Sequence, residues 1–251
     1  MQILSGNLVG YANITPQNVS GGRYSGGGSS FLSISGSGYC LKDFKIVNPG
    51  GEWGEDDIIQ FIQAGSCKLD EEMSFYWDTE TENWAYAFNA GGHSEYDPVG
   101  DDMLSRVIPA GVGFLCNFKT AGAQIVYAGE VNKGVNGEIV CTRSSGRYVY
   151  TVNPNPYEIT LADVKITNPG GEWGEDDIIQ FMQPNNCKLD EEKSFYWDTE
   201  IDGWGYAFNA GGHAEYDPVE DPSAIKIKAG EAFLFNAKTA EARVVVTAPK
   251  L

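Results

Sequence analysis

A block of 52 residues occurs twice in this chain, and this internal repeat constrains the fold more than any other feature of the sequence. Residues 48–99 align without a gap with residues 168–219, and 42 of the 52 positions are identical. Both copies begin NPGGEWGEDDIIQF and end GGHSEYDPV or GGHAEYDPV. A chain with such a repeat is expected to fold as two similar units.

Weaker matches extend the repeat on both sides of this block. They pair, in chain order, 21–24 with 145–148, 39–47 with 159–167 and 108–127 with 227–246, the last with a shift of one residue. We therefore predict two homologous modules, residues 1–133 and residues 134–251.

Acidic residues are spread over both predicted modules. The chain holds 35 Asp and Glu against 17 Lys and Arg, a formal net charge of −18 at pH 7, and each module carries half of it. Binding to nucleic acid or to anionic lipid requires clustered basic residues, so this composition argues against both partners. The longest apolar runs are far shorter than the roughly 18 residues of a membrane-spanning helix. The sequence thus predicts a globular protein with no nucleic-acid partner and no membrane span.

Each predicted module has the pattern of an all-β fold. Residues 74–88 alternate aromatic and polar side chains around a polar turn, which predicts a β-hairpin, and the second copy carries Asp202-Gly203 at that turn. Further strands are predicted at DIIQFIQ, GVGFLCNF and QIVYAGEV, which are rich in β-branched and aromatic residues. LKDF and LADV are predicted to form one short helical turn each. Short strands at this density are typical of two tandem homologous β-sandwich (or small β-barrel) modules.

Several motifs together resemble a family of bacterial proteins. NLVGYANI at 7–14, a GEDDIIQF strand, a YWD…W hairpin, PAGVGFLCNF and a closing AGEV at 128–131 follow one another in this order. They resemble duplicated modules of uncharacterised secreted proteins of the Verrucomicrobia–Lentisphaerae group. The resemblance implies export and no established chemistry. The second module departs from the pattern, because it opens with GEIVCTRS and ends with VVVTAPKL.

Aromatic residues in and around the predicted hairpin are the candidate ligand-binding residues. Proteins hold sugars by stacking an aromatic ring on the C–H face of the sugar while nearby polar groups bond its hydroxyls. The alternative is that alternate residues of the hairpin form the core. The candidates are Trp53, Tyr76, Trp84, Tyr86, Trp173, Tyr196, Trp204 and Tyr206, and the same pattern includes Trp77, Tyr96, Trp197 and Tyr216.

Two clusters in each module are candidate metal sites. On an extended segment His93, Glu95 and Asp97 would share one face, where an imidazole and two carboxylates could hold a divalent metal. Carboxylates beside glycine-rich turns suit Ca²⁺, the one cofactor that the sequence suggests, although no EF-hand spacing is present. The alternative is solvated carboxylates that bond the backbone. The candidates are Glu55, Asp56, Asp57, His93, Glu95, Asp97, Glu175, Asp176, Asp177, His213, Glu215 and Asp217.

The sequence contains no recognisable catalytic motif, and we predict that the protein is not an enzyme. G-x-S-x-G is absent. The glycine-rich segment SGGGSS at 25–30 lacks the lysine of a phosphate-binding loop and is interpreted as a flexible loop. The cysteines form no shared disulfide framework, since only two of them are equivalent in the repeat; we interpret them as small buried apolar residues, with cross-linking of neighbours as the alternative. They are Cys40, Cys67, Cys116, Cys141 and Cys187.

Two functions fit these observations. The first is a non-enzymatic extracellular structural protein that self-associates into a filament or surface layer, because contacts between near-identical modules can repeat from one molecule to the next. Strands at the chain ends, in GNLVGYANI and RVVVTAPKL, would complete a neighbour's sheet. The alternative is a carbohydrate-binding or adhesive surface module that uses the hairpin aromatics and the acidic loops. The predicted location is extracellular or at the cell surface, with the signal peptide outside this chain.

Overall fold

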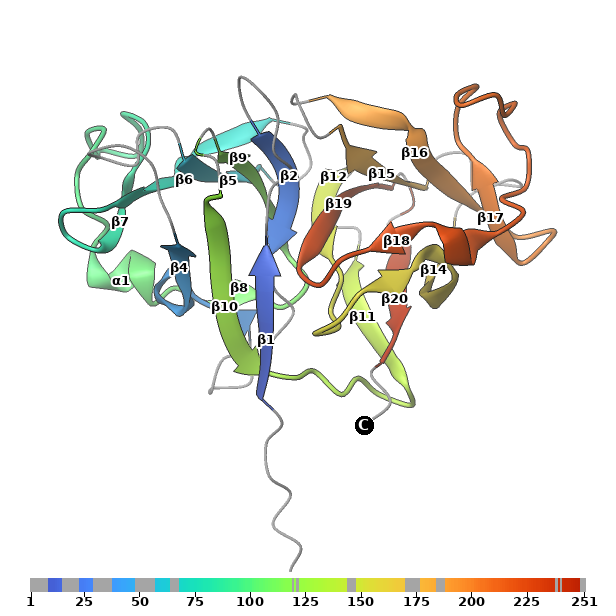
Figure 1. Cartoon of the computed structure of the whole chain (residues 1–251), viewed down its shortest axis with the longest axis horizontal. Coiled ribbons are helices and arrows are strands. Elements are labelled where there is room, and N and C mark those ends of the chain that lie inside the picture. The colour runs from blue at the N-terminus through green and yellow to red at the C-terminus, as the bar shows by residue number, and fades with distance from the viewer. Residues whose placement is uncertain are drawn as a thin grey trace, which may run out of the picture.

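The structure is a computed structural model that is all-β apart from a few short helical turns (Figure 1). It describes residues 9–14, 23–28, 38–47, 57–63, 68–118, 120, 122–143, 148–169, 177–183, 188–237, 239 and 241–248.

Ten of the described strands form one antiparallel sheet that runs through both halves of the molecule. The repeat therefore does not give two separate large sheets. β12 (Tyr148–Val152) pairs with β19 beside the main path. The order along the path is β17 (Gly203–Tyr206), β16 (Leu189–Asp198), β15 (Ile178–Met182), β19 (Glu231–Asn236), β2 (Arg23–Gly28), β9 (Gly113–Phe118), β5 (Asp57–Ile62), β6 (Leu69–Asp78) and β7 (Asn83–Tyr86).

A three-stranded sheet accompanies the large sheet in each half. The first contains β1 (Val9–Ile14), β10 (Gln124–Glu130) and β4 (Phe44–Val47), and the second contains β11 (Glu138–Arg143), β20 (Arg243–Thr247) and β14 (Val164–Thr167). Two strand pairs complete the sheets: β3 (Gly38–Tyr39) with β8 (Ile108–Pro109), and β13 (Ile159–Thr160) with β18 (Lys226–Ile227). Among the described strands no sheet closes into a barrel, so the small-barrel alternative is wrong.

The helical segments are single turns. LKDF and LADV each contain one, as predicted, because a capping box at Cys40 and Thr160 closes each turn through an aspartate carboxylate. Within the described ranges the helical segments are η1 (Leu41–Asp43), α1 (Asp101–Leu104), η2 (Leu161–Asp163) and η3 (Pro222–Ala224).

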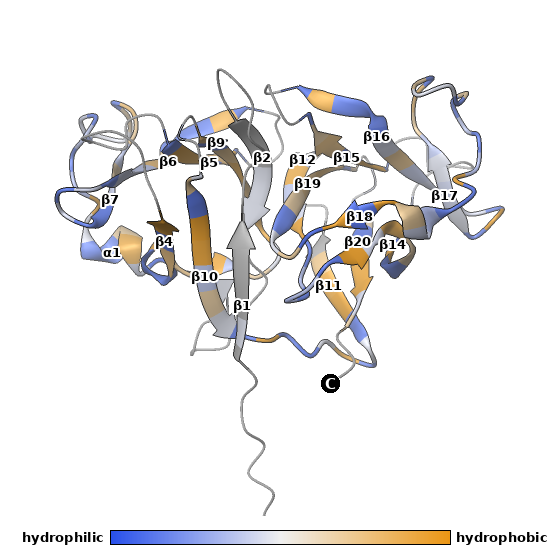
Figure 2. Ribbon diagram, in the orientation of Figure 1, coloured by the Kyte–Doolittle hydropathy of each residue, from blue (hydrophilic) through white to orange (hydrophobic). Residues whose placement is uncertain are grey.

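Apolar side chains from the facing sheets form one large buried cluster in each half. In the first half Phe44 of β4 meets Phe114 of β9 edge to face, with ring centroids 5.6 Å apart. In the second half Phe233 and Phe235 of β19 lie in the same cluster as Val244 of β20. Figure 2 shows this apolar character on β10, β11 and β20, whereas the turns beside β7 and β17 are largely hydrophilic.

The hairpin predicted at 74–88 is present in both halves. Phe75 pairs with Tyr86 and Trp77 with Trp84 across β6 and β7, and β16 and β17 repeat this register. Beyond these strands, the turn that follows each hairpin covers its outer edge: Tyr86 N–H donates to Asp97 O and Val99 N–H donates to Trp84 O, at 3.0 and 2.9 Å. Both ends of the ten-stranded sheet are therefore closed by backbone hydrogen bonds.

The glycine-rich segment near the N-terminus forms a central strand, so its interpretation as a flexible loop is wrong for residues 25–28. Gly26 and Gly27 of β2 pair with Ala232 and Glu231 of β19, which joins the two halves. A Cβ at position 26 would lie 2.1 Å from the backbone oxygen of Ala232. Glycine is needed here because two backbones approach each other closely, a requirement that composition does not reveal.

The contact between the halves is reciprocal. Gly27 of the first half pairs with Glu231 of the second. Thr151 of the second half is equivalent to Gly27, and Val112 of the first half is equivalent to Glu231; these two residues form a β-bridge as well. A third apolar cluster fills this junction, with Leu115 from one half and Tyr150, Val152, Ala232 and Leu234 from the other. A reciprocal contact closes at two copies. This contact is therefore completed within one molecule, and any contact between molecules would have to use other surfaces.

The strands near the chain ends pair within their own chain. β1 pairs with β10, and β20 lies between β11 and β14. The prediction that a terminal strand completes a neighbour's sheet is therefore wrong for β20, which is paired on both sides, whereas β1 ends the order of its sheet.

Candidate functional site

Half of the predicted ligand-binding aromatics belong to the core. Tyr76, Trp84, Tyr196 and Trp204 are at most 2% exposed. The indole N–H of Trp84 donates to Leu41 O at 2.9 Å, and that of Trp204 donates to Leu161 O and Val164 O. Because these rings are enclosed on all sides, they present no face on which a sugar can stack. Two further candidates, Trp53 and Trp173, lie outside the described residues.

The remaining two candidates, Tyr86 and Tyr206, each carry a histidine on their ring face. The rings of Tyr86 and His93 are stacked with centroids 4.0 Å apart, and Tyr206 and His213 repeat the stack at 3.9 Å. Burial raises the pKa of Tyr86, and burial together with the Glu220 carboxylate raises the pKa of Tyr206. The two phenols therefore stay neutral over the physiological range, and the histidines cover the ring faces that a sugar would need.

The segment with His93, Glu95 and Asp97 is a compact turn, so the prediction of an extended segment with one common face is wrong. Residues 89–98 form the histidine turn: His93 N–H donates to Ala90 O, and Asp97 N–H donates to Ser94 O. The Asp97 carboxylate accepts the Ser94 N–H at 2.8 Å, which is the alternative role that we gave it. His213, Glu215 and Asp217 lie in the equivalent turn with the same backbone bonds.

The second proposed metal cluster is only partly described. Asp57 and Asp177 are fully buried, and their carboxylates accept the backbone N–H groups of Thr120 and Thr239 at 3.0 and 3.1 Å. Their partners Glu55, Asp56, Glu175 and Asp176 lie outside the described residues. In the part of the chain that the structure describes, no three His, Cys, Asp or Glu side chains gather closely enough to hold a metal ion.

An irregular strand pairing places four residues of β6 outside the regular ladder. Gln60 of β5 pairs with Ser74, but Ile62, only two residues later, pairs with Leu69. The chain between these partners, Asp70–Met73, therefore bulges from the sheet, and Ser74 Oγ fixes it by donating to Asp70 O at 2.7 Å. Bulges of this kind are common beside functional sites.

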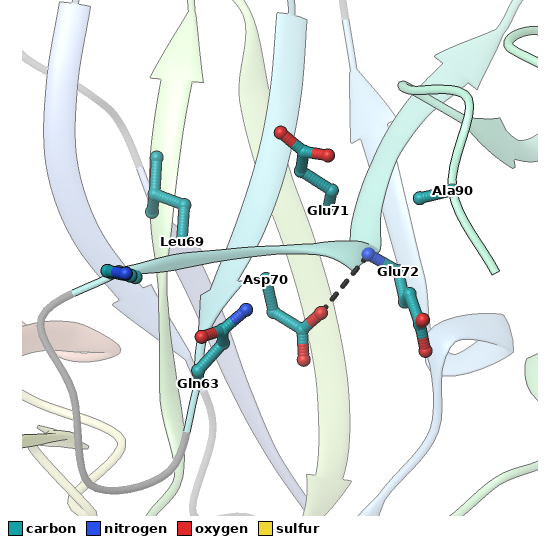
Figure 3. Close-up of a pocket in the computed structure, with 7 residues that line it drawn as sticks. Gln63, Leu69, Asp70, Glu71, Glu72 and Ala90 are labelled. Atoms are coloured by element: carbon teal, nitrogen blue, oxygen red, sulfur yellow. Dashed lines mark hydrogen bonds between the residues drawn. The ribbon is translucent and has the colours of Figure 1, made fainter.

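The bulge forms one wall of an open groove of about 550 Å³, which we call the acidic groove (Figure 3). Glu71 projects to one side of the strand and Asp70 and Glu72 to the other, while Asp70 Oδ1 accepts the Glu72 N–H at 3.1 Å. The histidine turn supplies the opposite wall through Ala90. The lining residues are Gln63, Lys68, Leu69, Asp70, Glu71, Glu72 and Ala90.

The second half repeats the residues and bonds of the acidic groove. Ser194 Oγ donates to Asp190 O at 2.7 Å, Glu192 N–H donates to Asp190 Oδ1 at 3.1 Å, and the register shift recurs between Gln180 and Met182. All seven lining residues are unchanged, at Gln183, Lys188, Leu189, Asp190, Glu191, Glu192 and Ala210.

Outside the 52-residue block the two halves differ in their core residues, whereas the surface of the groove, inside the block, is preserved. Buried residues outside the 52-residue block have been exchanged, namely Tyr39 for Ile159, Phe44 for Val164, Cys116 for Phe235, Phe118 for Ala237, Ile125 for Val244 and Tyr127 for Val246. Most exposed residues of the groove and the histidine turn are identical, namely Lys68, Glu71, Glu72, Asn89, His93, Glu95, Tyr96 and Asp97 with their copies, whereas Ser94 is replaced by Ala214. Exposed loops normally vary more than cores, so it is notable that these exposed residues match as closely as buried residues of the block such as Phe75 and Trp84.

Sequence reasoning missed the acidic groove. In the sequence its charged residues resemble the solvated end of a strand. Only the folded structure shows that they line a groove. The signal that could have found them is the identity of polar residues between the copies at positions that packing does not constrain.

Among the described residues of the repeat, the aromatic residues Tyr96 and Tyr216 are exposed. They are 43% and 41% exposed, with backbone φ angles of 73° and 74°. Each ring contacts the buried Tyr76 or Tyr196 edge to face, at 5.3 and 5.4 Å. An aromatic residue in the left-handed region costs conformational energy. Both turns nevertheless hold a tyrosine in this conformation, so the two copies share the same backbone geometry at this position.

The described cysteines follow the interpretation as small buried residues. Cys40, Cys116 and Cys141 are buried, and burial raises the pKa of Cys141 far above its usual range. Cys67 and Cys187 lie outside the described residues.

These observations define an all-β protein that displays the same acidic surface twice. No family model, curated protein or solved structure matches the chain. None of the helices in the described ranges is long and apolar enough to cross a membrane.

Proposed function

We propose that the chain is a non-enzymatic carbohydrate-binding or adhesive surface protein with two equivalent sites, one in each half. The observation that carries this proposal is the acidic groove, whose seven lining residues are the same in both halves, beside a histidine turn that differs between the copies only at Ser94 and Ala214. The proposal includes the division into two sandwich modules, 1–133 and 134–251, which is supported by the separate apolar clusters. It also includes an extracellular or cell-surface location, as the resemblance to secreted bacterial proteins implies.

The lining of the acidic groove suits a ligand rich in hydroxyl groups. Carboxylates of Asp70, Glu71 and Glu72 accept hydrogen bonds, whereas the Lys68 ammonium donates them and the Gln63 amide does both. A sugar hydroxyl both donates and accepts, so it can use both kinds of group. Because the groove is open along one side, a polymer can pass through it without a chain end.

The position of the two copies favours simultaneous binding. The turns beside β7 and β17 lie near opposite ends of the longest axis of the molecule (Figure 1). Two sites held apart on one rigid sheet can engage one long polymer or two neighbouring chains. Such linkage raises the apparent affinity by about 10²–10⁴-fold over that of a single site.

Glu72→Gln and Glu192→Gln test this proposal. Each single variant is expected to weaken retention on an insoluble polysaccharide by about 100-fold through loss of avidity, and the double variant is expected to abolish it. The measurement is depletion of protein from solution by cellulose, chitin, xylan and starch.

The matched control is the pair Glu80→Gln and Glu200→Gln. It removes the same charge from exposed hairpin turns outside the groove and should leave retention unchanged. Failure of the wild-type protein to bind any of the four polymers, or equal losses in both pairs, would contradict the proposal.

Self-association into a filament or layer is a second candidate, favoured by the edges of the three-stranded sheets. β4 and β14 each end the order of their sheet, and Val47 on β4 is 40% exposed. Edge strands can pair with another chain. This candidate predicts a particle mass in light scattering that rises above 27.3 kDa with concentration; a monomer at the highest attainable concentration excludes it.

A further inference from the structure

A second, smaller cavity lies in the C-terminal half, apart from the acidic groove. Its volume is about 120 Å³, and it is lined by residues of β11, η2, β14, β16 and β20. We propose that this cavity is a saccharide subsite that binds one pyranose ring, in addition to the two acidic grooves. The inference rests on the proposed carbohydrate-binding function and assigns a separate site to it.

The cavity combines an aromatic and aliphatic wall with charged groups at its rim. Trp197 is half-buried, and Trp204 holds it edge to face at a centroid distance of 5.1 Å and an interplanar angle of 88°. Val164 and Val245, both buried, add aliphatic surface. A sugar ring has apolar C–H faces and a polar equator, and a lining of this mixed kind matches both.

The charged groups are held in place before any ligand arrives. Lys165 Nζ lies 2.5 Å from Glu138 Oε1, and both side chains are more than 40% exposed. An ion pair this exposed contributes little to stability, so folding does not account for its position at the rim. The Asp163 carboxylate is fixed by hydrogen bonds from Thr160 N–H and Oγ1, at 2.8 and 2.9 Å.

The size of the cavity limits how much of a ligand can enter it. Since one water occupies about 30 Å³ in the liquid, 120 Å³ is room for about four waters. That is too little for a polymer segment and less than a whole pyranose, so a single sugar unit would insert one edge or face and leave the rest in solvent. The acidic groove, at about 550 Å³, is the larger and more open of the two.

The first half has a different residue at the position of Glu138. β1 pairs with β10 as β11 pairs with β20, which places Tyr11 at the position of Glu138 and Ala128 at the position of Thr247. Lys45 and Trp77 stand where the second half has Lys165 and Trp197. Trp77 has the same edge-to-face contact with Trp84, at 5.2 Å and 85°. Since tyrosine replaces the Glu138 carboxylate at this register position, Trp77 serves as a control for Trp197.

The test uses the full chain with the methyl glycosides of glucose, galactose, mannose and N-acetylglucosamine as probes. Saturation-transfer NMR should detect binding of at least one probe to the wild-type protein. Trp197→Phe and Glu138→Gln should each weaken that binding by about tenfold, whereas Trp77→Phe should leave it unchanged. Glu138→Gln alters only an exposed side chain, so its effect does not depend on the core.

The two proposals fail in different ways. If no glycoside binds, or if Trp77→Phe weakens binding as much as Trp197→Phe, the subsite is overturned even when polysaccharides are retained. If a glycoside binds and both Trp197→Phe and Glu138→Gln weaken it, the subsite stands even when the Glu72→Gln and Glu192→Gln pair shows that the grooves bind nothing.

Discussion

Gly26→Ala is expected to lower the free energy of unfolding by about 3 kcal/mol, at the upper end of the usual cost of overpacking. The new methyl group would lie 2.1 Å from the backbone oxygen of Ala232. β19 cannot move away easily, because β12 and β15 also pair with it. The junction between the halves must therefore open locally. Urea unfolding followed by tryptophan fluorescence measures the loss.

Gly100→Ala is the matched control for this substitution. A Cβ at position 100 would meet nothing within 4 Å, and the residue has an ordinary φ of −70°. Its effect should stay within about 0.5 kcal/mol. If Gly26→Ala is no more destabilising than Gly100→Ala, the two halves are not joined through β2 as described.

Trp84→Ala is expected to cost about 3–5 kcal/mol, as for other large buried aromatic residues. The side chain is 1% exposed, and its removal would leave both a cavity and the Leu41 carbonyl without its indole donor. Trp204→Ala should cost at least as much, because the Trp204 indole is shared between two carbonyls. Thermal and urea unfolding both report this change.

An exposed apolar residue of the equivalent hairpin in the second half, which carries Trp204, provides the comparison. Ile201 is 50% exposed at the turn before β17, so Ile201→Ala should be close to neutral. A loss below about 1 kcal/mol for Trp84→Ala would mean that this indole does not organise the core, since fully buried large side chains cost more than this.

Local features of the fold could be predicted from the sequence, whereas the contact between the halves could not. The hairpin at 74–88 and the turn at Leu41–Asp43 depend on residues close together in the chain, and both were predicted correctly. The pairing of Gly26 with Ala232 joins positions far apart in sequence. Nothing in a run of glycines distinguishes a flexible loop from a strand that another backbone approaches closely.

The candidate site was predicted only in part, for a related reason. Alternation identifies two faces of a hairpin but does not say which is buried, so Trp84 and Tyr76 looked equally suited to core and ligand. The bulge at Asp70–Met73 depends on a shifted register between two strands, which the charges of this segment do not encode. The histidine turn was noticed through His93, but its compact backbone was missed.

The reciprocal junction has a consequence for the history of this architecture. A single unit with the surface of either half would carry both sides of the contact, so it would be expected to form a symmetric homodimer. The present chain then corresponds to that dimer with its subunits fused end to end. Fusion frees the two sides to differ, and they do: Gly26 stands on one side where Tyr150 stands on the other. The fused form thereby fixes one partner for each half, which an unlinked pair of identical subunits could not do.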